Sequence, residues 1–115
     1  MIELVHGDAD IIRQVEGKVT RTTYCIAAIE DGKVLGIAGY YPRDDHLVAW
    51  VRVTPELKQR PRLIVQGARM LLAMMARRRM PIVAGRDVDE PSAKRFLTHF
   101  GFTPYKGDTW VRWPR

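Results

Sequence analysis

The feature that most constrains the fold is a long apolar helix pattern between two strand patterns. Pro61–Arg79 has a proline in its first turn and three arginines at its carboxyl end, as helices prefer. Its apolar positions cover more than half of the helix circumference, so we expect the helix to be buried against a sheet. One strand pattern ends near Val53, and another runs over Ile82–Val88. This order predicts a β-α-β crossover with two parallel strands.

The rest of the chain predicts an antiparallel meander before the crossover and a hairpin after it. Asp31-Gly32 is a strong hairpin-turn signal between two β-rich runs, and a second turn follows at Pro42–Asp45. A further helix is expected over Ala9–Gly17, and Lys106–Asp108 should turn the closing hairpin. We therefore expect one α/β (α+β) domain over residues 1–115. Its sheet should be mixed and mainly antiparallel, with helices on both faces.

Composition narrows the class of protein. With 46% hydrophobic and 28% charged residues, the chain has the make-up of a globular protein. Nineteen Lys and Arg against thirteen Asp and Glu leave a net charge of +6, which favours anionic partners such as a phosphorylated cofactor. The lone Cys25 excludes an internal disulfide framework. No signal segment and no membrane-spanning apolar run is evident, so we expect a cytoplasmic protein.

The last helix pattern ends in an unusual way. In SAKRFLTHFGF, Ser92–Phe102, the residues Ala93, Phe96, Leu97 and Phe100 recur at helical spacing, and Gly101 then stops the helix before a second aromatic residue. This segment, together with DGKVLGIAGYY and LVAWVRVTPEL earlier in the chain, resembles the GNAT superfamily of acyl-CoA-dependent N-acyltransferases. The resemblance covers about Lys33 to Trp113. It implies a GNAT-like mixed sheet with a central β-α-β crossover.

The resemblance also implies a function and a site. An acetyl group would pass from acetyl-CoA to an amine acceptor, either a small molecule or a protein. Backbone groups of Val51, Arg52 and Val53 would hold the acyl carbonyl. The loop over Gln59–Leu63 would hold the pyrophosphate, with Gln59, Arg60, Arg62 and Leu63 as its ligands. Independently, ligands of such sheets bind beyond the carboxyl ends of parallel strands, where a helix amino end suits an anion.

Two departures from the family pattern keep a second interpretation open. The phosphate loop of the family is glycine-rich, whereas QRPRLIV has no glycine, and Pro61 lacks an N–H. Leu97 stands where the family typically has a tyrosine that protonates the leaving thiolate. The alternative is a catalytically silent GNAT-fold protein of a bacteriophage, acting as a binding or virion-associated protein. It would be similar to an internal virion protein of short-tailed phages.

Other candidate chemistry is sparse. Asp44, Asp45 and His46 are the best general-base candidates, because a loop before the fourth strand could face an acceptor amine, although a polar turn is the simpler explanation. Tyr105 is a candidate acid in the closing hairpin, with core or edge packing as the favoured alternative. No histidine or cysteine spacing fits a metal site. Nucleic acid is not an expected partner, because cations at a helix carboxyl end need none. A homodimer or an assembly with virion proteins is also considered.

Overall fold

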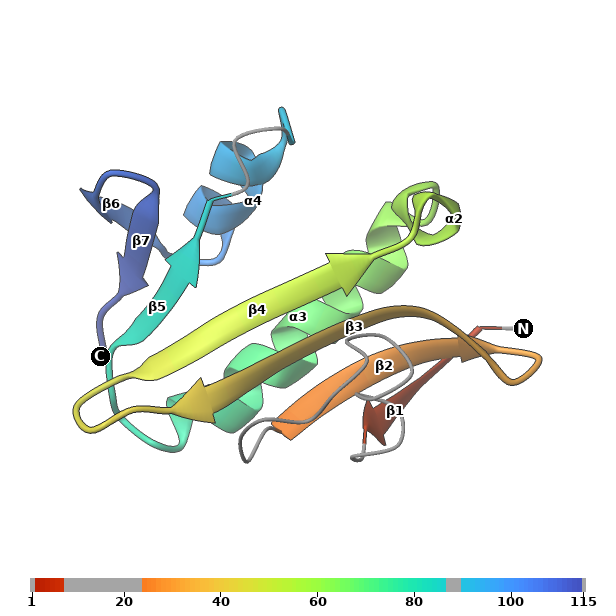
Figure 1. Ribbon diagram of the computed structural model, residues 1–115, viewed down its shortest axis with the longest axis horizontal. Coiled ribbons are helices and arrows are strands. Elements are labelled where there is room, and N and C mark those ends of the chain that lie inside the picture. Colours follow the sequence, from red (N-terminus) through yellow and green to blue (C-terminus); the bar gives the residue numbers. More distant parts are fainter. Residues whose placement is uncertain (1, 8–23, 87–89, 115) are drawn as a thin grey trace.

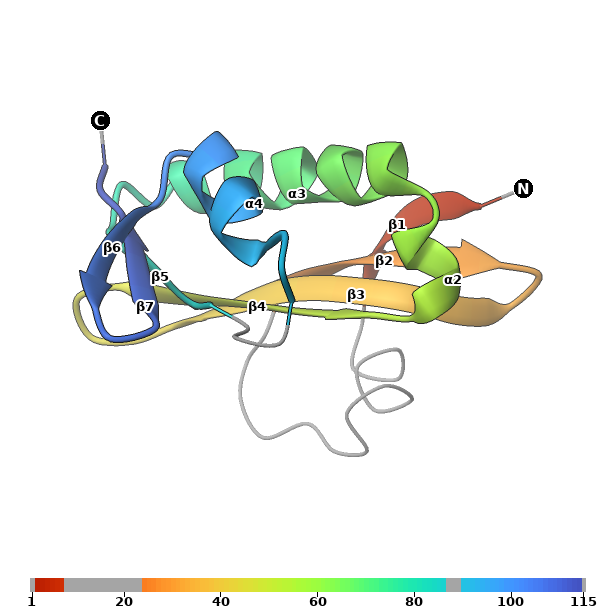
Figure 2. The ribbon, with the colours of Figure 1, turned by 90° about the horizontal axis from the view of Figure 1, so that it is seen from above.

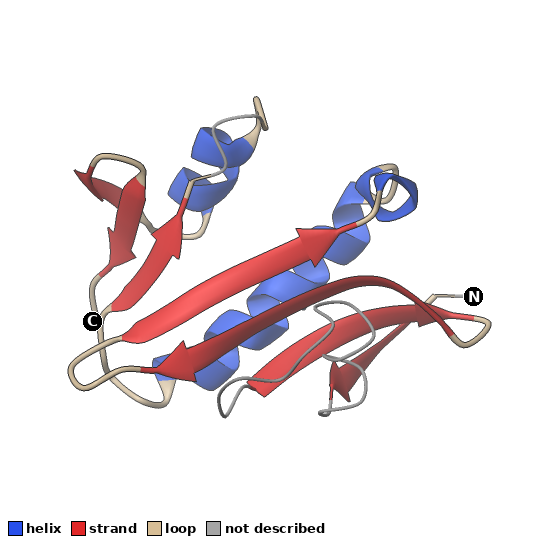
Figure 3. Ribbon diagram, in the orientation of Figure 1, coloured by secondary structure: helices blue, strands red, loops and turns tan. Residues whose placement is uncertain are grey.

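The computed structural model describes residues 2–7, 24–86 and 90–114 (Figures 1 and 3). The strands are β1 (Glu3–Gly7), β2 (Tyr24–Glu30), β3 (Lys33–Pro42), β4 (Leu47–Val53), β5 (Ile82–Gly85), β6 (Thr103–Lys106) and β7 (Thr109–Arg112). The helices are α2 (Pro55–Lys58), α3 (Pro61–Ala76) and α4 (Ala93–His99). The predicted helix over residues 9–17 lies outside the described residues. Strand β5 ends at Gly85, before the predicted end at Val88, and residues 87–89 are also outside the described part.

All seven strands form one sheet, in the order β1-β2-β3-β4-β5-β7-β6. The pair β4 and β5 is parallel, and the other pairs are antiparallel. Helix α3 connects the two parallel strands and packs against β2 and β3. The predicted crossover and the mixed, mainly antiparallel sheet are therefore confirmed.

The helices that the structure describes lie together on one face of the sheet (Figure 2). Beneath them is the main core, which includes Leu47 of β4, Met75 of α3 and Leu97 of α4. Successive strand residues point to opposite faces, so the separate cluster around Cys25 and Ile37 lies on the other face. Helices were predicted on both faces, and the helix predicted over residues 9–17 lies outside the described residues. No helix of the described part is long and apolar enough to cross a membrane.

The predicted turns are confirmed. The helices differ from the prediction in two respects, the end of α3 and the presence of α2. Asp31 and Gly32 both have positive φ, 51° and 78°, as a two-residue hairpin turn requires. Helix α3 ends at Ala76, three residues before the predicted end, and Arg79 has a φ of 53°. The short helix α2 was not predicted. It begins because the Thr54 hydroxyl accepts a hydrogen bond from the Leu57 N–H.

The Phe-Gly-Phe ending of α4 is a Schellman motif. Gly101 has a φ of 85°, and its N–H donates to the Thr98 carbonyl, while the Phe102 N–H donates to the Leu97 carbonyl. Leu97 and Phe102 are both buried in the main core. The motif therefore caps the helix and drops the second aromatic side chain into the core.

Candidate functional site

Strand β4 has an edge that β5 covers only in part. Their register runs from Leu47 opposite Ile82 to Ala49 opposite Ala84. Beyond Ala49 the two strands diverge (Figure 1), and β4 continues to Val53 paired with β3 alone among the described strands. We call the β5 side of Trp50–Val53 the open edge of β4.

Backbone groups at the open edge are placed by the alternation of strand hydrogen bonds. The Leu47 N–H donates to Pro81 O on the β5 side, at 2.9 Å. The Thr54 N–H donates to Leu35 O on the β3 side, at 3.0 Å. Because alternate residues of a strand point their N–H groups to opposite sides, Val51 and Val53 direct theirs toward the open edge. These residues are the ones expected to hold an acyl carbonyl.

Arg52 adds a positive charge beside this edge. Its Nη1 donates to the Val51 carbonyl oxygen at 3.0 Å, so that acceptor is already engaged. The Val51 side chain is 49% exposed. The open edge therefore offers N–H donors and a guanidinium, which suit an electron-rich carbonyl oxygen.

The connection from β4 to α3 is held firmly. Thr54 donates its hydroxyl to Leu35 O at 2.7 Å, and Leu57 of α2 is buried against Leu35 and Val53. Gln59 caps α2 at its carboxyl end, and Arg60 occupies the N-cap position of α3. The loop expected to bind a pyrophosphate is thus at the carboxyl end of β4, next to the open edge.

Few backbone donors remain at the amino end of α3. Pro61 has no N–H, and the Leu63 and Ile64 N–H groups both donate to Arg60 O, at 3.1 and 3.4 Å. Arg62 is the remaining residue of this turn with an N–H available to a ligand. The first turn of α3 contains no acidic residue. An anion here would consequently be held mainly by side chains.

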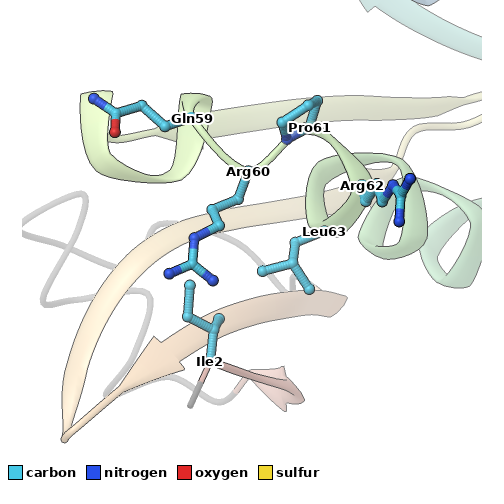
Figure 4. Close-up of a pocket in the computed structure, with 6 residues that line it drawn as sticks. All are labelled: Ile2, Gln59, Arg60, Pro61, Arg62 and Leu63. Carbon is cyan, nitrogen blue, oxygen red and sulfur yellow. The ribbon is translucent and has the colours of Figure 1, made fainter.

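A shallow pocket of about 500 Å³ opens beside this turn. Its lining residues are Ile2, Gln59, Arg60, Pro61, Arg62 and Leu63. Figure 4 shows the Arg60 side chain extending toward Ile2 and Leu63, while the Arg62 side chain points away from them. Both arginines are exposed. The two guanidinium groups therefore flank Pro61 on different sides.

An ion pair joins the segment after β4 to the segment before α4. Lys58 Nζ lies 3.1 Å from Glu90 Oε2, and Ser92 Oγ donates to Glu90 Oε1 at 2.9 Å. The Ser92 hydrogen bond and then the Lys58 ammonium hold the pKa of Glu90 below its ordinary value. Lys58 follows β4 and Glu90 precedes α4, so the contact ties the segment after one parallel strand to the segment after the other.

The predicted general bases lie elsewhere. Asp44, Asp45 and His46 form the turn before β4, where His46 Nδ1 is 2.6 Å from Asp45 Oδ1. The hydrogen bond from His46 lowers the pKa of Asp45. Val53 is seven residues beyond His46, which is about 23 Å at the usual rise of a strand. The structure does not bring this turn to the open edge.

Tyr105, the predicted acid, lies away from the open edge. Leu97, at the position of the family tyrosine, is buried. Tyr105 is 65% exposed on β6, where its ring contacts Trp113 edge to face at 6.3 Å. Strands β5 and β7 separate β6 from β4. Leu97 is 9% exposed in the main core. Within the described ranges, no group of three or more potential ligands could hold a metal ion.

Sequence reasoning missed Glu90 as a partner of Lys58. The two residues are 32 positions apart, and no local pattern links them. The available signal was that each follows one strand of a parallel pair, because the carboxyl ends of parallel strands lie at the same edge of a sheet.

This mixed sheet with its crossover helix is the fold of the GNAT acetyltransferases. The ribosomal-protein-S18-alanine N-acetyltransferase of Escherichia coli matches with a TM-score of 0.70 and 13% identity, over 96% of this chain and 90% of that one. A GNAT-family acetyltransferase of Staphylococcus aureus Mu50 matches with 0.69 and 10% identity, over 97% and 98%. At such identities the likeness concerns the fold.

A third structure shows a bound cofactor. The PaiA N-acetyltransferase of Thermoplasma acidophilum, in complex with coenzyme A, matches with a TM-score of 0.62 and 11% identity, over 89% of this chain and 64% of that one. No protein-family model matches the sequence, and the comparison with curated proteins finds no match.

Proposed function

We propose that this protein is a GNAT-type N-acetyltransferase that moves an acetyl group from acetyl-CoA to an amine. The observation that carries the proposal is the open edge of β4 beside the Arg60–Arg62 turn. Backbone donors suited to an acyl carbonyl and two guanidinium groups suited to a pyrophosphate follow one another along the chain. The bound coenzyme A in the fold neighbour from Thermoplasma acidophilum supports a ligand of this class.

In the proposed reaction, the amine nitrogen attacks the thioester carbonyl carbon. A C–N bond forms, the C–S bond breaks, and coenzyme A leaves as the thiolate. The Val51 and Val53 N–H groups stabilise the negative charge that develops on the carbonyl oxygen. Arg60 and Arg62 hold the pyrophosphate in place of a glycine cradle. Because the Asp44–His46 turn and Tyr105 lie away from the open edge, we assign both proton transfers to water.

A non-catalytic binding protein with the same fold is the second candidate. It is favoured by the buried Leu97, which supplies no acid, and by Pro61, which removes one donor from the phosphate loop. The fold likenesses do not bear on the bacteriophage resemblance, which stays a prediction. The amine acceptor, a cytoplasmic location and the oligomeric state also stay predictions.

The deciding experiment is calorimetric titration with acetyl-CoA. Replacing both Arg60→Ala and Arg62→Ala should raise the Kd at least about a hundredfold, because each lost charge-assisted hydrogen bond costs about 1.5–3 kcal/mol. The melting temperature of the free protein should stay nearly unchanged, because both side chains are exposed. Arg77→Ala with Arg78→Ala, at the other end of α3, is the matched control and should leave the Kd unchanged.

The outcomes separate the two candidates. Binding with turnover of an amine supports the transferase. Binding without turnover supports the non-catalytic protein. A wild-type protein that does not bind millimolar acetyl-CoA would contradict both uses of the Arg60–Arg62 turn.

A further inference from the structure

Acidic residues are missing from the part of the chain that builds two helices. Residues 57–86 contain no Asp or Glu, and neither do residues 91–107. The first of these stretches includes eight cations: Lys58, Arg60, Arg62, Arg69, Arg77, Arg78, Arg79 and Arg86. The second includes Lys94 and Arg95 on α4. Helices α3 and α4 therefore carry positive charge only.

The fold brings these charges to one side of the molecule. Figure 2 shows α3 and α4 on the same face of the sheet, and the main core packs beneath both of them. We define the basic helical face by the cations on or directly after α3, excluding the Arg60–Arg62 turn, and by those on α4. They are Arg69, Arg77, Arg78, Arg79, Lys94 and Arg95, and all six are exposed. None has an ion-pair partner within the described ranges.

The stability of the helices does not account for all of these charges. Cations after the last turn of α3 interact favourably with the helix dipole. Lys94 and Arg95 lie instead in the first turn of α4, where the dipole disfavours a cation and favours an acid. That turn contains no acidic residue. The helix dipole therefore does not account for these two cations.

The side chains of the basic helical face indicate the class of partner that it would bind. Five of the six cations are arginines, whose planar guanidinium matches phosphate oxygens in pairs. The large exposed hydrophobic residues are Tyr24, Val51, Tyr105 and Trp113, and none of them is on α3 or α4. The face lacks the apolar anchors of a protein interface or of a helix that inserts into a membrane surface. The rings that α4 does carry, Phe96, His99 and Phe100, pack against one another, and both phenylalanines are half-buried, so they do not form an open platform for stacking unpaired bases.

We propose that the basic helical face binds the phosphate backbone of a nucleic-acid duplex, independently of base sequence. Contacts of this kind require only cations at spaced positions on a rigid surface. The helices supply that surface, and within the described residues their charges form no ion pair with neighbouring acids. This inference reverses the expectation from sequence that nucleic acid is not a partner. It is also independent of acetyl-CoA binding, since the face excludes Arg60 and Arg62.

The test is fluorescence anisotropy with a labelled duplex of about 20 base pairs. DNA and RNA duplexes of mixed sequence should both bind, and log Kd should rise with log salt concentration with a slope of about 4–5, as expected for some five released counterions. Lys94→Glu with Arg95→Glu should weaken binding at least about tenfold and lower the slope by about two. The melting temperature of this variant should be unchanged or higher, because glutamates suit the first turn of a helix.

The control keeps the same change in net charge but places it elsewhere. Arg43→Glu with Lys106→Glu alters exposed residues of a turn and of β6, on neither helix, and should leave the Kd within about twofold once general charge effects are screened. Equal weakening by both double variants would overturn the proposal, as would a salt-independent Kd. Equally tight binding of polyglutamate or of anionic lipid vesicles would overturn it as well.

Discussion

Gly101 sets the end of α4 through a backbone conformation that other residues adopt at a cost. Its φ of 85° lies in the left-handed region, where a side chain costs about 1–2 kcal/mol. We expect Gly101→Ala to lower the free energy of unfolding by that amount in urea denaturation. Gly85→Ala is the control, because a Cβ at Gly85 would meet nothing within 4 Å and its φ is not positive. Equal losses in the two variants would contradict this interpretation.

A substitution at Leu97 tests whether the proposed active site lacks a general acid. Leu97→Tyr adds volume to a packed core position and should cost about 1–3 kcal/mol of stability in urea denaturation. If its hydroxyl reaches the leaving thiolate, turnover should rise by about 10²–10⁴-fold while the Kd of acetyl-CoA stays constant. Leu97→Phe has nearly the same shape without the hydroxyl and is the matched control. A rate increase with phenylalanine would rule out acid catalysis as the cause.

At the scale of elements, the contact of Glu90 with Lys58 and Ser92, which joins the segment after β4 to the start of α4, depends on pH. The pKa of Glu90 is lowered in the folded protein, so its interactions add stability above the ordinary pKa of a glutamate, about 4.3. That stability is lost as pH falls through the lowered pKa. Ser92→Ala should raise the pKa of Glu90 more than Lys58→Met does, because the Ser92 hydrogen bond is the larger cause. Titration of the Glu90 carboxyl by NMR measures both shifts, and the opposite ranking would contradict the assignment.

The elements differ in how far sequence alone predicts them. The crossover and the Asp31-Gly32 turn follow from local patterns, namely helical periodicity and a two-residue turn signal. The Arg60–Leu63 hydrogen bond that consumes a donor at the start of α3 depends on the irregular backbone at Arg60, which no pattern indicates. The predicted general-base role of the Asp44–His46 turn rests on a loop before β4 that could face an amine, although that place puts the turn at the opposite end of β4 from Val53.

For the whole molecule, the sheet should show a graded resistance to opening. Ala27 and Ile37 in the central strands are at most 2% exposed, whereas all four residues of the edge strand β6 are exposed. Amide hydrogen exchange should therefore be slowest in β2 and β3 and fastest in β6, because edge strands open with little loss of buried surface. Exchange at Tyr105 as slow as at Ile37 would contradict this order. Mass spectrometry of peptides or NMR of single amides provides the measurement.

An unpaired strand edge is also a template for a strand from another chain. The outer edge of β6 carries Pro104 and a bulge, both of which discourage such pairing. Within the described residues, the open edge of β4 has no proline and no bulge, and although Arg52 engages the Val51 carbonyl, Val51 and Val53 direct their N–H groups outward along a regular strand. A ligand or segment that occupies this edge therefore also prevents a strand of another chain from pairing with it, which opposes aggregation. A ligand held there would keep the protein soluble, in addition to any chemistry that the ligand undergoes.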